Sequence, residues 1–375
     1  MAEIRLPSGS IITAFPIPPA GFNPLTADEV ALRQYGLPPR PAGNAAQAEL
    51  WRRVVGIPTQ YLKPTFERSE DKQHGPRRVL VGTEGSDNWS GAVAYVTPGN
   101  QFRSIAAEWT VPAVGPESND GGNYYSSFWI GIDGDSTNGV HSPDVFQAGV
   151  GCDVVRNASG VYLWWEWYPE NEVRITNFPV SIGHTLSCLL TVISNTEGKV
   201  FLRNQTTGAA TAFQITAPNR TTLVGNSAEW IAERPQVGGA LTKLAVFSPI
   251  MFTACAANTN LGQTLRPIDG DNINMSDGVV ILATGFIPAA DTVDCIYTGP
   301  VPISPVALPG RIAALAGDVL YVKKDGLTAF GFEKRTTFKS LLWKAIASRH
   351  LTPQATYGSR RGRSMQFGWG LKKTR

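Results

Sequence analysis

The sequence is poor in histidine and in charge, and it has no long apolar run. Of its 375 residues only 4 are His, and 17% are Asp, Glu, Lys or Arg. No apolar run reaches the length of about 20 residues that a membrane-spanning helix needs. The start, MAEIRLPSGS, also lacks the charged-then-apolar pattern of a signal peptide. The sequence therefore predicts no transmembrane segment and carries no recognisable export signal.

The motifs of the usual hydrolase classes are missing as well. The sequence contains no HExxH, no GxSxG leading into a helix and no paired aspartates of the DTG kind. A Ser-His-Asp site needs a His as its base, and only His141 and His184 lie within residues 85–300. We therefore expect no His-based nucleophile, no metal site and no cofactor.

The four cysteines form no CxxC pair, so the usual spacing of a metal site is absent. They are Cys152, Cys188, Cys255 and Cys295. Two disulfides, in any of three connectivities, would fit these positions. Four buried free thiols would fit them equally well, and the sequence leaves both arrangements open.

Charge divides the chain into three parts. Residues 1–84 hold 10 Lys/Arg and 8 Asp/Glu, residues 85–300 hold 9 and 19, and residues 301–375 hold 14 and 3. The net charges are +2, −10 and +11, which sum to the +3 of the whole chain. We expect a prosegment over 1–80, an acidic body, and a Pro-rich linker followed by a mobile basic tail. The tail would suit polyanions such as nucleic acid, anionic lipid or cell-wall polymer, or would be a dispensable solvated extension.

Helical patterns are few. Residues 1–21 are Pro-rich and predict irregular structure. Thr26 is a candidate cap for a short helix that stops at Gly36, and a second helix is predicted over 45–55. Residues 67–78, ERSEDKQHGPRR, form a charged linker without an apolar period. This unit ahead of the body is typical of a prosegment, although a plain extension would have the same pattern. In the tail, FKSLLWKAIASRH predicts a short amphipathic helix.

From Asn88 onward apolar and polar residues alternate, which is typical of strands. About thirteen segments show this pattern between turn residues, enough for two stacked antiparallel sheets. They cover 91–96, 102–111, 126–133, 144–150, 161–168, 172–176, 184–194, 199–205, 211–216, 227–233, 241–252, 278–284 and 292–298. The sequence therefore predicts an all-β body.

Alternation also assigns faces to the strands. In DVFQAGV, Phe146 and Val150 belong to the core, which turns Gln147 toward an open face. In SAEWIAE, Trp230 packs inward with its alanine neighbours and Glu229 projects the other way. In YLWWEWY both faces are aromatic, so we expect one to be core and the other, which carries Glu166, to line a groove.

Several motifs, in order, resemble the glutamic peptidases, or eqolisins. They are NWSGAVAYV, FRSIAAEWTVPAV, FWIGIDGD, FQAGV, WWEWYP and NSAEWI, and the resemblance covers residues 86–299. It implies a concanavalin-like β-sandwich of two seven-stranded antiparallel sheets and an active site on a concave sheet face. It further implies protein or peptide substrates and action outside the cell. We expect a monomer.

The resemblance implies a catalytic dyad. The family's Gln falls on Gln147 of FQAGV and its Glu on Glu229 of NSAEW. A carboxylate can take a proton from water and later give it to the leaving amine, while a neutral amide NH₂ can stabilise the oxyanion. The family's Trp and Asp positions in these motifs fall on Trp89, Trp129 and Asp133.

Asp135 and Glu166 complete the residues that we expect to bind substrate or support the dyad. Asp133 and Asp135 are also ordinary turn formers, and a Ca²⁺ loop is a further alternative, although the EF-hand spacing is absent. The sequence departs from the family at Gly151, where many members carry an acid four residues after the Gln; Asp153 follows two positions later.

Two other functions fit an aromatic two-sheet body. A lectin-like module would bind carbohydrate on its concave face without hydrolysis. A glycosidase would pair Glu229 with Glu166 as its two carboxyl groups. For the peptidase, we expect the basic prosegment residues to lie on the acidic groove at neutral pH, and acid to weaken that attraction and allow self-cleavage.

Overall fold

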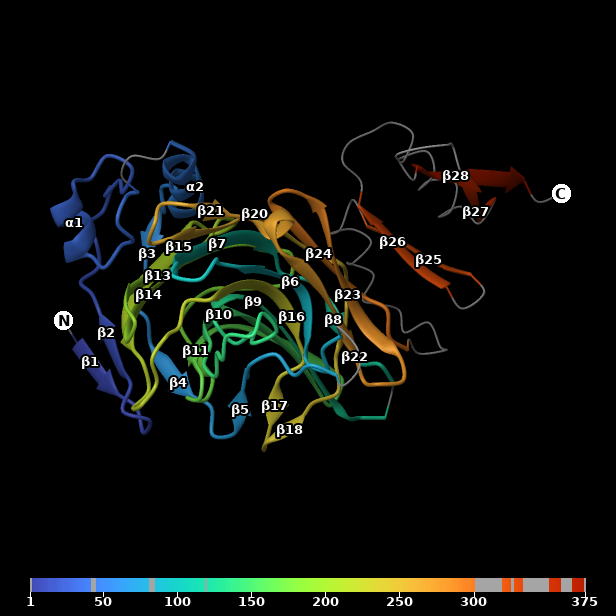
Figure 1. Cartoon of the computed structure of the whole chain (residues 1–375), viewed down its shortest axis with the longest axis horizontal. Helices are drawn as coiled ribbons and strands as arrows, with labels where there is room; N and C mark the ends of the chain where they lie inside the picture. Colours follow the sequence, from blue (N-terminus) through green and yellow to red (C-terminus); the bar gives the residue numbers. More distant parts are fainter. Residues whose placement is uncertain are drawn as a thin grey trace. The chain divides into compact units, whose positions relative to one another are not determined.

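The computed structural model describes residues 2–41, 45–80, 85–118 and 120–300, together with the backbone of four strands further on. The chain divides into two compact units, Met1–Val306 and Ala307–Arg375. Within the first unit, two sheets stack face to face (Figure 1). Helix α2 (Ala45–Val55) lies outside one sheet, and strands β5 (Lys72–Gln73) and β17 (Gln236–Val237) lie outside the other.

The front sheet carries the candidate site. Its strands are all antiparallel and run in the order β22-β6-β16-β9-β10-β11-β12-β4. In that order their bounds are Asp271–Ser276, Trp89–Tyr95, Ser227–Glu233, Asn123–Ile132, Phe146–Val155, Ala158–Trp167, Val173–Ile175 and Phe66–Arg68. Of these strands only β4 comes from the N-terminal region.

The back sheet runs β20-β7-β13-β14-β15-β2-β1, also antiparallel, and β3 joins β15 in parallel. In order, with β3 last, the bounds are Ile250–Thr259, Phe102–Thr110, Thr185–Ser194, Glu197–Asn204, Ala209–Thr216, Ile11–Ala14, Ala2–Arg5 and Gln60–Tyr61. Strands from the N-terminal region therefore complete the edges of both sheets.

Smaller elements close the first unit. Strands β23 and β24 (Ile281–Ala289, Thr292–Tyr297) link β22 to β20, and β21 (Thr264–Leu265) extends the end of β20. Strand β17 pairs with β5 and β18, and β8 pairs with β19. In the order β17, β5, β18, β8, β19 and the 3-10 helix η1, the bounds are Gln236–Val237, Lys72–Gln73, Ala240–Leu241, Val114–Gly115, Val246–Phe247 and Pro267–Asp269.

The core lies between the two sheets and follows the predicted alternation. Phe146 and Val150 on β10, Trp230 on β16 and Trp165 on β11 are all fully buried in it. The opposite face of the front sheet holds a second aromatic cluster that includes Trp164. The prediction of an antiparallel two-sheet sandwich with one core face per sheet is confirmed.

Most predicted strands are present, and the exceptions have local causes. Segment 241–252 does not form one strand; its residues belong to the end of β18, to β19 and to the start of β20. Strand β22 was missed, since DNINMS has few apolar residues. The four cysteines are free and buried, which selects the free-thiol alternative.

The N-terminal region contains the two predicted helices, α1 (Glu29–Gln34) and α2 (Ala45–Val55). The cap of α1 is Asp28, whose carboxylate accepts from the Ala31 amide, so the prediction of Thr26 was wrong by two residues. Gly36 follows α1 with φ of 69°, as a helix stop should. The expectation of irregular structure over 1–21 was also wrong, because β1 and β2 lie there.

The second unit contains strands β25 to β28, in two antiparallel pairs. Their bounds are Val319–Lys324, Leu327–Phe332, Leu351–Gly358 and Gln366–Lys373. The helix predicted over 338–350 lies outside the described residues, and the mobility of the tail stays a prediction. No helix within the described residues combines the length and hydrophobicity needed to cross a bilayer.

Candidate active site

Gln147 and Glu229 lie on either side of one glycine. Gln147 on β10 and Glu229 on β16 are both in register with Gly131 on the strand between them, β9. Directly opposed residues of antiparallel strands point to the same face. Since neighbouring strands are about 4.8 Å apart, the two α-carbons are about 10 Å apart. The structure thus brings the two predicted catalytic residues together on the face opposite the core.

Gly131 keeps the space between the two side chains open. A β-carbon at this position would lie 2.7 Å from the ring of Trp129 and 3.3 Å from the β-carbon of Gln147. Trp129 forms the floor next to the gap, and its indole Nε1 donates to Glu233 at 2.8 Å. Trp89 meets Trp129 edge to face, with ring centroids 5.0 Å apart. Both tryptophans are fully buried and fix the floor of the site.

Glu229 is fully buried. Within the part of the chain that the structure describes, neither of its carboxyl oxygens has a hydrogen-bond partner of normal geometry. Burial raises the pKa of Glu229 well above its usual range; the Ser227 hydroxyl offsets this in part, and the charges of Asp133 and Asp135 add to it. Burial therefore favours the neutral carboxylic acid over the carboxylate at this side chain.

Asp133 holds the start of β16. Its carboxylate accepts hydrogen bonds from three backbone amides, those of Val224 at 2.6 Å, Gly225 at 3.0 Å and Asn226 at 2.9 Å. Burial raises its pKa to about 6, against the effect of these bonds. Because the residues that it holds lead directly into β16, Asp133 positions the strand that carries Glu229.

Asp135 binds a residue from the N-terminal region. It pairs with Arg77 at 2.8 Å and accepts from the Tyr95 hydroxyl at 3.0 Å. Asp133 and Asp135 are therefore more than turn formers. Among the described residues, no group of three or more His, Cys, Asp or Glu side chains is arranged to hold a metal ion.

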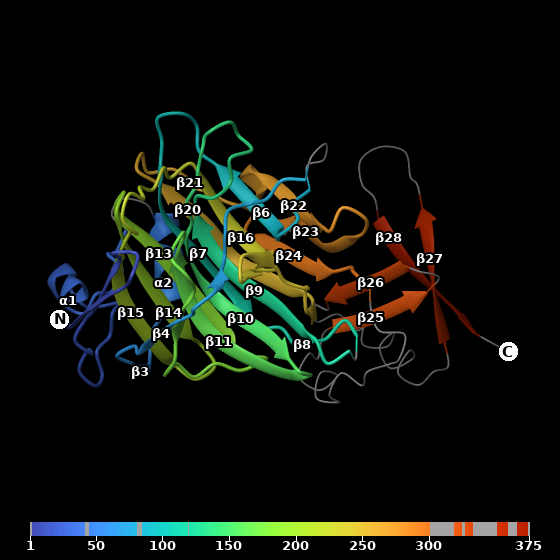
Figure 2. The ribbon, with the colours of Figure 1, turned by 90° about the horizontal axis from the view of Figure 1, so that it is seen from below.

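Residues 69–78, which we call the plug, lie on the face that carries Gln147 and Glu229 (Figures 1 and 2). The backbone carbonyl of His74 accepts a hydrogen bond from the Gln147 amide NH₂. The His74 amide donates to both oxygens of Glu166 at 3.0 Å. The plug is thus hydrogen-bonded to two residues of one row across the front sheet, because Glu166 is in register with Gln147.

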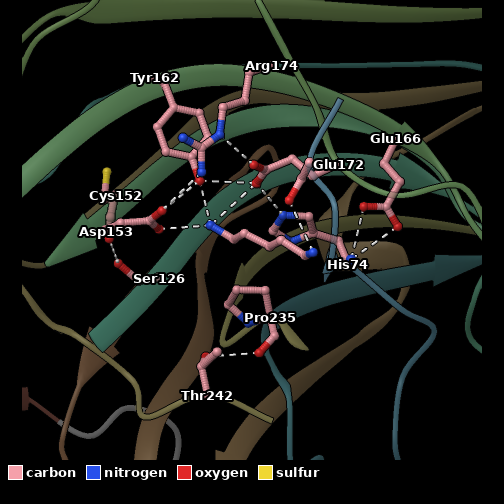
Figure 3. Close-up of polar contacts among 12 residues, drawn as sticks. His74, Ser126, Cys152, Asp153, Tyr162, Glu166, Glu172, Arg174, Pro235 and Thr242 are labelled. Atoms are coloured by element: carbon pink, nitrogen blue, oxygen red, sulfur yellow. Dashed lines mark hydrogen bonds and ion pairs between the residues drawn. The ribbon is translucent and has the colours of Figure 1, made fainter. Parts of the chain in front are cut away.

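The His74 ring is held by an aromatic ring and two carboxylates. It stacks on Trp164 with ring centroids 3.7 Å apart and an interplanar angle of 7°. Its Nδ1 lies 2.9 Å from Glu233 and its Nε2 lies 3.0 Å from Glu172 (Figure 3). Burial opposes a charge on the ring, but the two carboxylates raise the pKa of His74 above its ordinary value. The two carboxylates therefore favour the imidazolium form of the ring.

Lys72 forms a second buried ionic contact of the plug. Its Nζ lies 2.8 Å from Asp153 and 3.3 Å from Glu172, and Tyr162 joins the same group (Figure 3). The predicted contact between prosegment cations and acids of the body is present at Lys72, as at Arg77. Gly151, the departure from the family pattern, is explained by Tyr162, since a β-carbon at Gly151 would lie 2.5 Å from its ring.

Sequence reasoning missed His74 and Glu172. His74 was set aside because it lies in a charged linker without an apolar period, and nothing in its neighbours signals burial. Glu172 begins a predicted strand, and an acidic residue at a strand end is usually solvated. Only the folded path of the plug brings these two side chains to the site.

Comparisons with known proteins found both similar sequences and similar structures. The sequence model of the peptidase A4 family matches residues 87–297. Aspergillopepsin-2 from Aspergillus niger is 27% identical over 255 residues, which cover 64% of this chain and 87% of the relative. Scytalidopepsin B from Scytalidium lignicola is 26% identical over 220 residues, which cover 56% of this chain and 75% of the relative.

Among solved structures, the chain is similar to scytalido-glutamic peptidase with a transition state analog inhibitor. The TM-score is 0.49 and the identity 23%, over 56% of this chain and 98% of that chain.

Proposed function

Since the chain belongs to the peptidase A4 family and is a peptidase, we propose that it cuts peptide bonds in acid with Glu229 and Gln147 as its catalytic pair. Glu229 would act first as general base and then as general acid, and Gln147 would stabilise the oxyanion. The observation that carries this proposal is the register that sets the two side chains on either side of Gly131.

The steps follow from the two side chains. The Glu229 carboxylate takes a proton from a water molecule as the water oxygen attacks the carbonyl carbon of the substrate. The carbonyl oxygen gains negative charge, and the Gln147 NH₂ donates a hydrogen bond to it. Glu229 then gives the proton to the leaving nitrogen as the C–N bond breaks. Asp133 and Trp129 position the pair without entering the reaction.

The plug supports the role of Gln147. The carbonyl of His74 already accepts from the Gln147 NH₂, as the carbonyl of a substrate would. With the plug in place, burial raises the pKa of Glu229 well above its usual range and disfavours the carboxylate that would take a proton from water. We propose that the plugged chain is an inactive precursor, and that release of the plug admits water and returns the Glu229 pKa toward about 4.3.

Self-cleavage would then remove the block. Of the plug's peptide bonds, His74–Gly75 is the one whose carbonyl lies on Gln147. We therefore propose that acid incubation produces a new N-terminus within about 70 to 85 residues of the start, with Gly75 as the first candidate. Sequencing of the new N-terminus tests this, and a chain that stays full-length in acid would contradict it.

Digestion of denatured haemoglobin between about pH 2 and 7 tests the catalytic pair, with a pepsin-type inhibitor present to exclude contamination. Gln147→Ala should lower kcat/KM about a hundredfold or more. Glu229→Gln should lower it about a thousandfold, with an unchanged unfolding temperature. Activity that survives both substitutions would contradict the proposal.

The geometry does not favour a glycosidase. A glycosidase needs two carboxyl groups that face the sugar from either side. The Glu166 carboxylate instead accepts hydrogen bonds from the His74 amide of the plug, and two further strands lie between its strand and that of Glu229. A lectin-like role without hydrolysis does not fit a peptidase family. Secretion, a monomeric state and polyanion binding by the tail stay predictions.

A further inference from the structure

The N-terminal region makes two unlike contacts with the body. Residues 69–78, the plug, contact the site through ionised side chains and through the His74 backbone. Residues 2–62, which we call the docked segment, pack on the back sheet instead. We propose that the docked segment stays bound to the peptidase body as a second, noncovalently held chain after the plug is cut. The proposal rests on activation by cleavage as described above.

The first contact of the docked segment is apolar. Helix α2 and the residues around it cover the outer face of strands β7, β13, β14 and β15. The contact is one cluster of buried apolar side chains. The docked segment contributes Leu32, Leu37, Trp51, Val54 and Val55, and the sheet contributes Ala106, Leu189, Phe201 and Ala210. All nine side chains are buried. Without the docked segment this face would be an exposed apolar patch, which proteins rarely leave uncovered.

The second contact is a sheet edge. Strand β2 pairs with β15 over Phe213 to Ile215, and β3 pairs with the other end of β15 at Ala209 and Ala210. Ile12 of β2 is fully buried in the main core. Loss of the docked segment would leave the backbone groups of β15 without partners along an open edge.

Polar contacts fix the register of α2 on the sheet. The Ser187 hydroxyl donates to the Val54 carbonyl at 2.9 Å, and both residues are fully buried. Arg53 pairs with Glu108 at 2.7 Å. The apolar and backbone contacts of the docked segment do not titrate, whereas the ion pairs of the plug join Asp or Glu to Lys, His or Arg. Acid can therefore release the plug while the docked segment stays bound.

The placement also allows activity with the docked segment in place. Helix α2 lies outside the back sheet, and the plug lies outside the front sheet (Figure 1). Gln147 and Glu229 face the plug, on the opposite side of the sandwich from α2. A docked segment that remains bound leaves the site open once the plug has moved.

The test uses a chain that cannot cut itself. A recognition sequence for a site-specific protease is inserted between Glu70 and Asp71, both exposed, in the full chain carrying Glu229→Gln. After cutting at neutral pH, size-exclusion chromatography is run at neutral pH and at about pH 3.5. The N-terminal fragment should co-elute with the body at both pH values, with a dissociation constant below about 1 μM. Separate elution at either pH overturns the proposal.

Matched variants show which contact holds the fragment. Val54→Glu places a charge in the buried apolar cluster and should weaken retention about a hundredfold. Arg52→Glu, on the same helix with a side chain that is 51% exposed, should leave it unchanged. Leu189→Glu and the exposed Ile193→Glu make the same comparison from β13, in case the first variant fails to fold. Equal retention in all four variants would overturn the proposal.

Failure of this proposal is distinguishable from failure of the proposed function. The cut is made by an added protease in an inactive background, so release of the fragment says nothing against catalysis by Gln147 and Glu229. Conversely, an inactive wild-type chain that retains its cut fragment would contradict the catalytic pair and leave the retention intact.

Discussion

The glycine between the two proposed catalytic side chains limits the volume at that point of the sheet. Gly131 places no side chain between Gln147 and Glu229, and a β-carbon there would lie 2.7 Å from the ring of Trp129. Any side chain at position 131 would have to displace Trp129 or Gln147, and both of these are fully buried. The spacing of the pair is therefore sensitive to a single methyl group.

Gly131→Ala should lower kcat/KM about a hundredfold, because a shift of about 1 Å in a catalytic group can cost that much. Gly160→Ala on β11 is the control, since a β-carbon there would meet nothing within 4 Å. Haemoglobin digestion in acid measures both variants. Full activity of Gly131→Ala would show that the space above Trp129 is not used by the substrate.

The pH at which the plug leaves depends on Glu172. Burial alone would raise the pKa of Glu172, but Lys72, His74 and Arg174 lower it well below its ordinary value. A carboxyl group with a lowered pKa stabilises the plugged form above its ordinary pKa of about 4.5, and this contribution is lost as the pH falls toward the lowered value. His74, with a raised pKa, stabilises the plugged form below about 6.5 and less as the pH rises.

Other groups in the site oppose simple release in mild acid. Glu166 and Glu229, with pKa values raised by burial, favour the plugged form when they are protonated. Plug release therefore needs stronger acid than charge complementarity alone suggested.

Glu172→Gln removes the shared partner of Lys72 and His74. The midpoint of self-shortening in a pH series should move upward by about one unit. Glu197→Gln on β14, in the back sheet, is the matched control and should leave the midpoint unchanged. A midpoint that does not move in Glu172→Gln would exclude this ion pair as the latch.

At the scale of elements, Asp133 links the turn after β9 to the start of β16. It has φ of 74°, a conformation that Asn and Asp tolerate better than most residues. Its three amide partners are buried or nearly so, so their loss leaves unsatisfied donors. The strand that carries Glu229 depends on this one carboxylate for its first residues.

Asp133→Ala should destabilise the chain by about 3 kcal/mol, which lowers the unfolding temperature by roughly 6 to 12 °C. Asp133→Asn keeps one acceptor oxygen, so its unfolding temperature should lie between those of the wild type and Asp133→Ala. Thermal unfolding followed by circular dichroism measures the series. An unfolding temperature of Asp133→Ala equal to that of the wild type would contradict the anchoring role.

Alternation in the sequence was sufficient to predict the sheets, because each strand buries one face. It placed Phe146 and Trp230 in the core and turned Gln147 and Glu229 away from it. It could not predict β1 and β2, since such short strands owe their pairing to the open edge of β15. Nor could it place His74, because the burial of the plug depends on a surface formed by strands far along the chain.

At the scale of the whole molecule, the first unit should be stable without the second. The boundary between the two compact units falls after residue 306 of the sequence. Residues 307–375 hold 14 Lys/Arg and 3 Asp/Glu, so their removal changes the net charge from +3 to −8. Truncation after Val306 should leave the unfolding temperature within about 2 °C of the full chain. It should also abolish binding to a heparin column, because polyanion binding follows the basic tail.

Deletion of residues 2–62 should have the opposite effect. It exposes the apolar face under α2 and the edge of β15, so the unfolding temperature should fall by more than about 10 °C and the protein should aggregate. The two deletions, compared by thermal unfolding and light scattering, separate a segment that completes the fold from one that adds charge. If deletion of residues 2–62 left the unfolding temperature unchanged, the N-terminal strands would not be needed to complete the back sheet, and the body over 85–300 would fold without them.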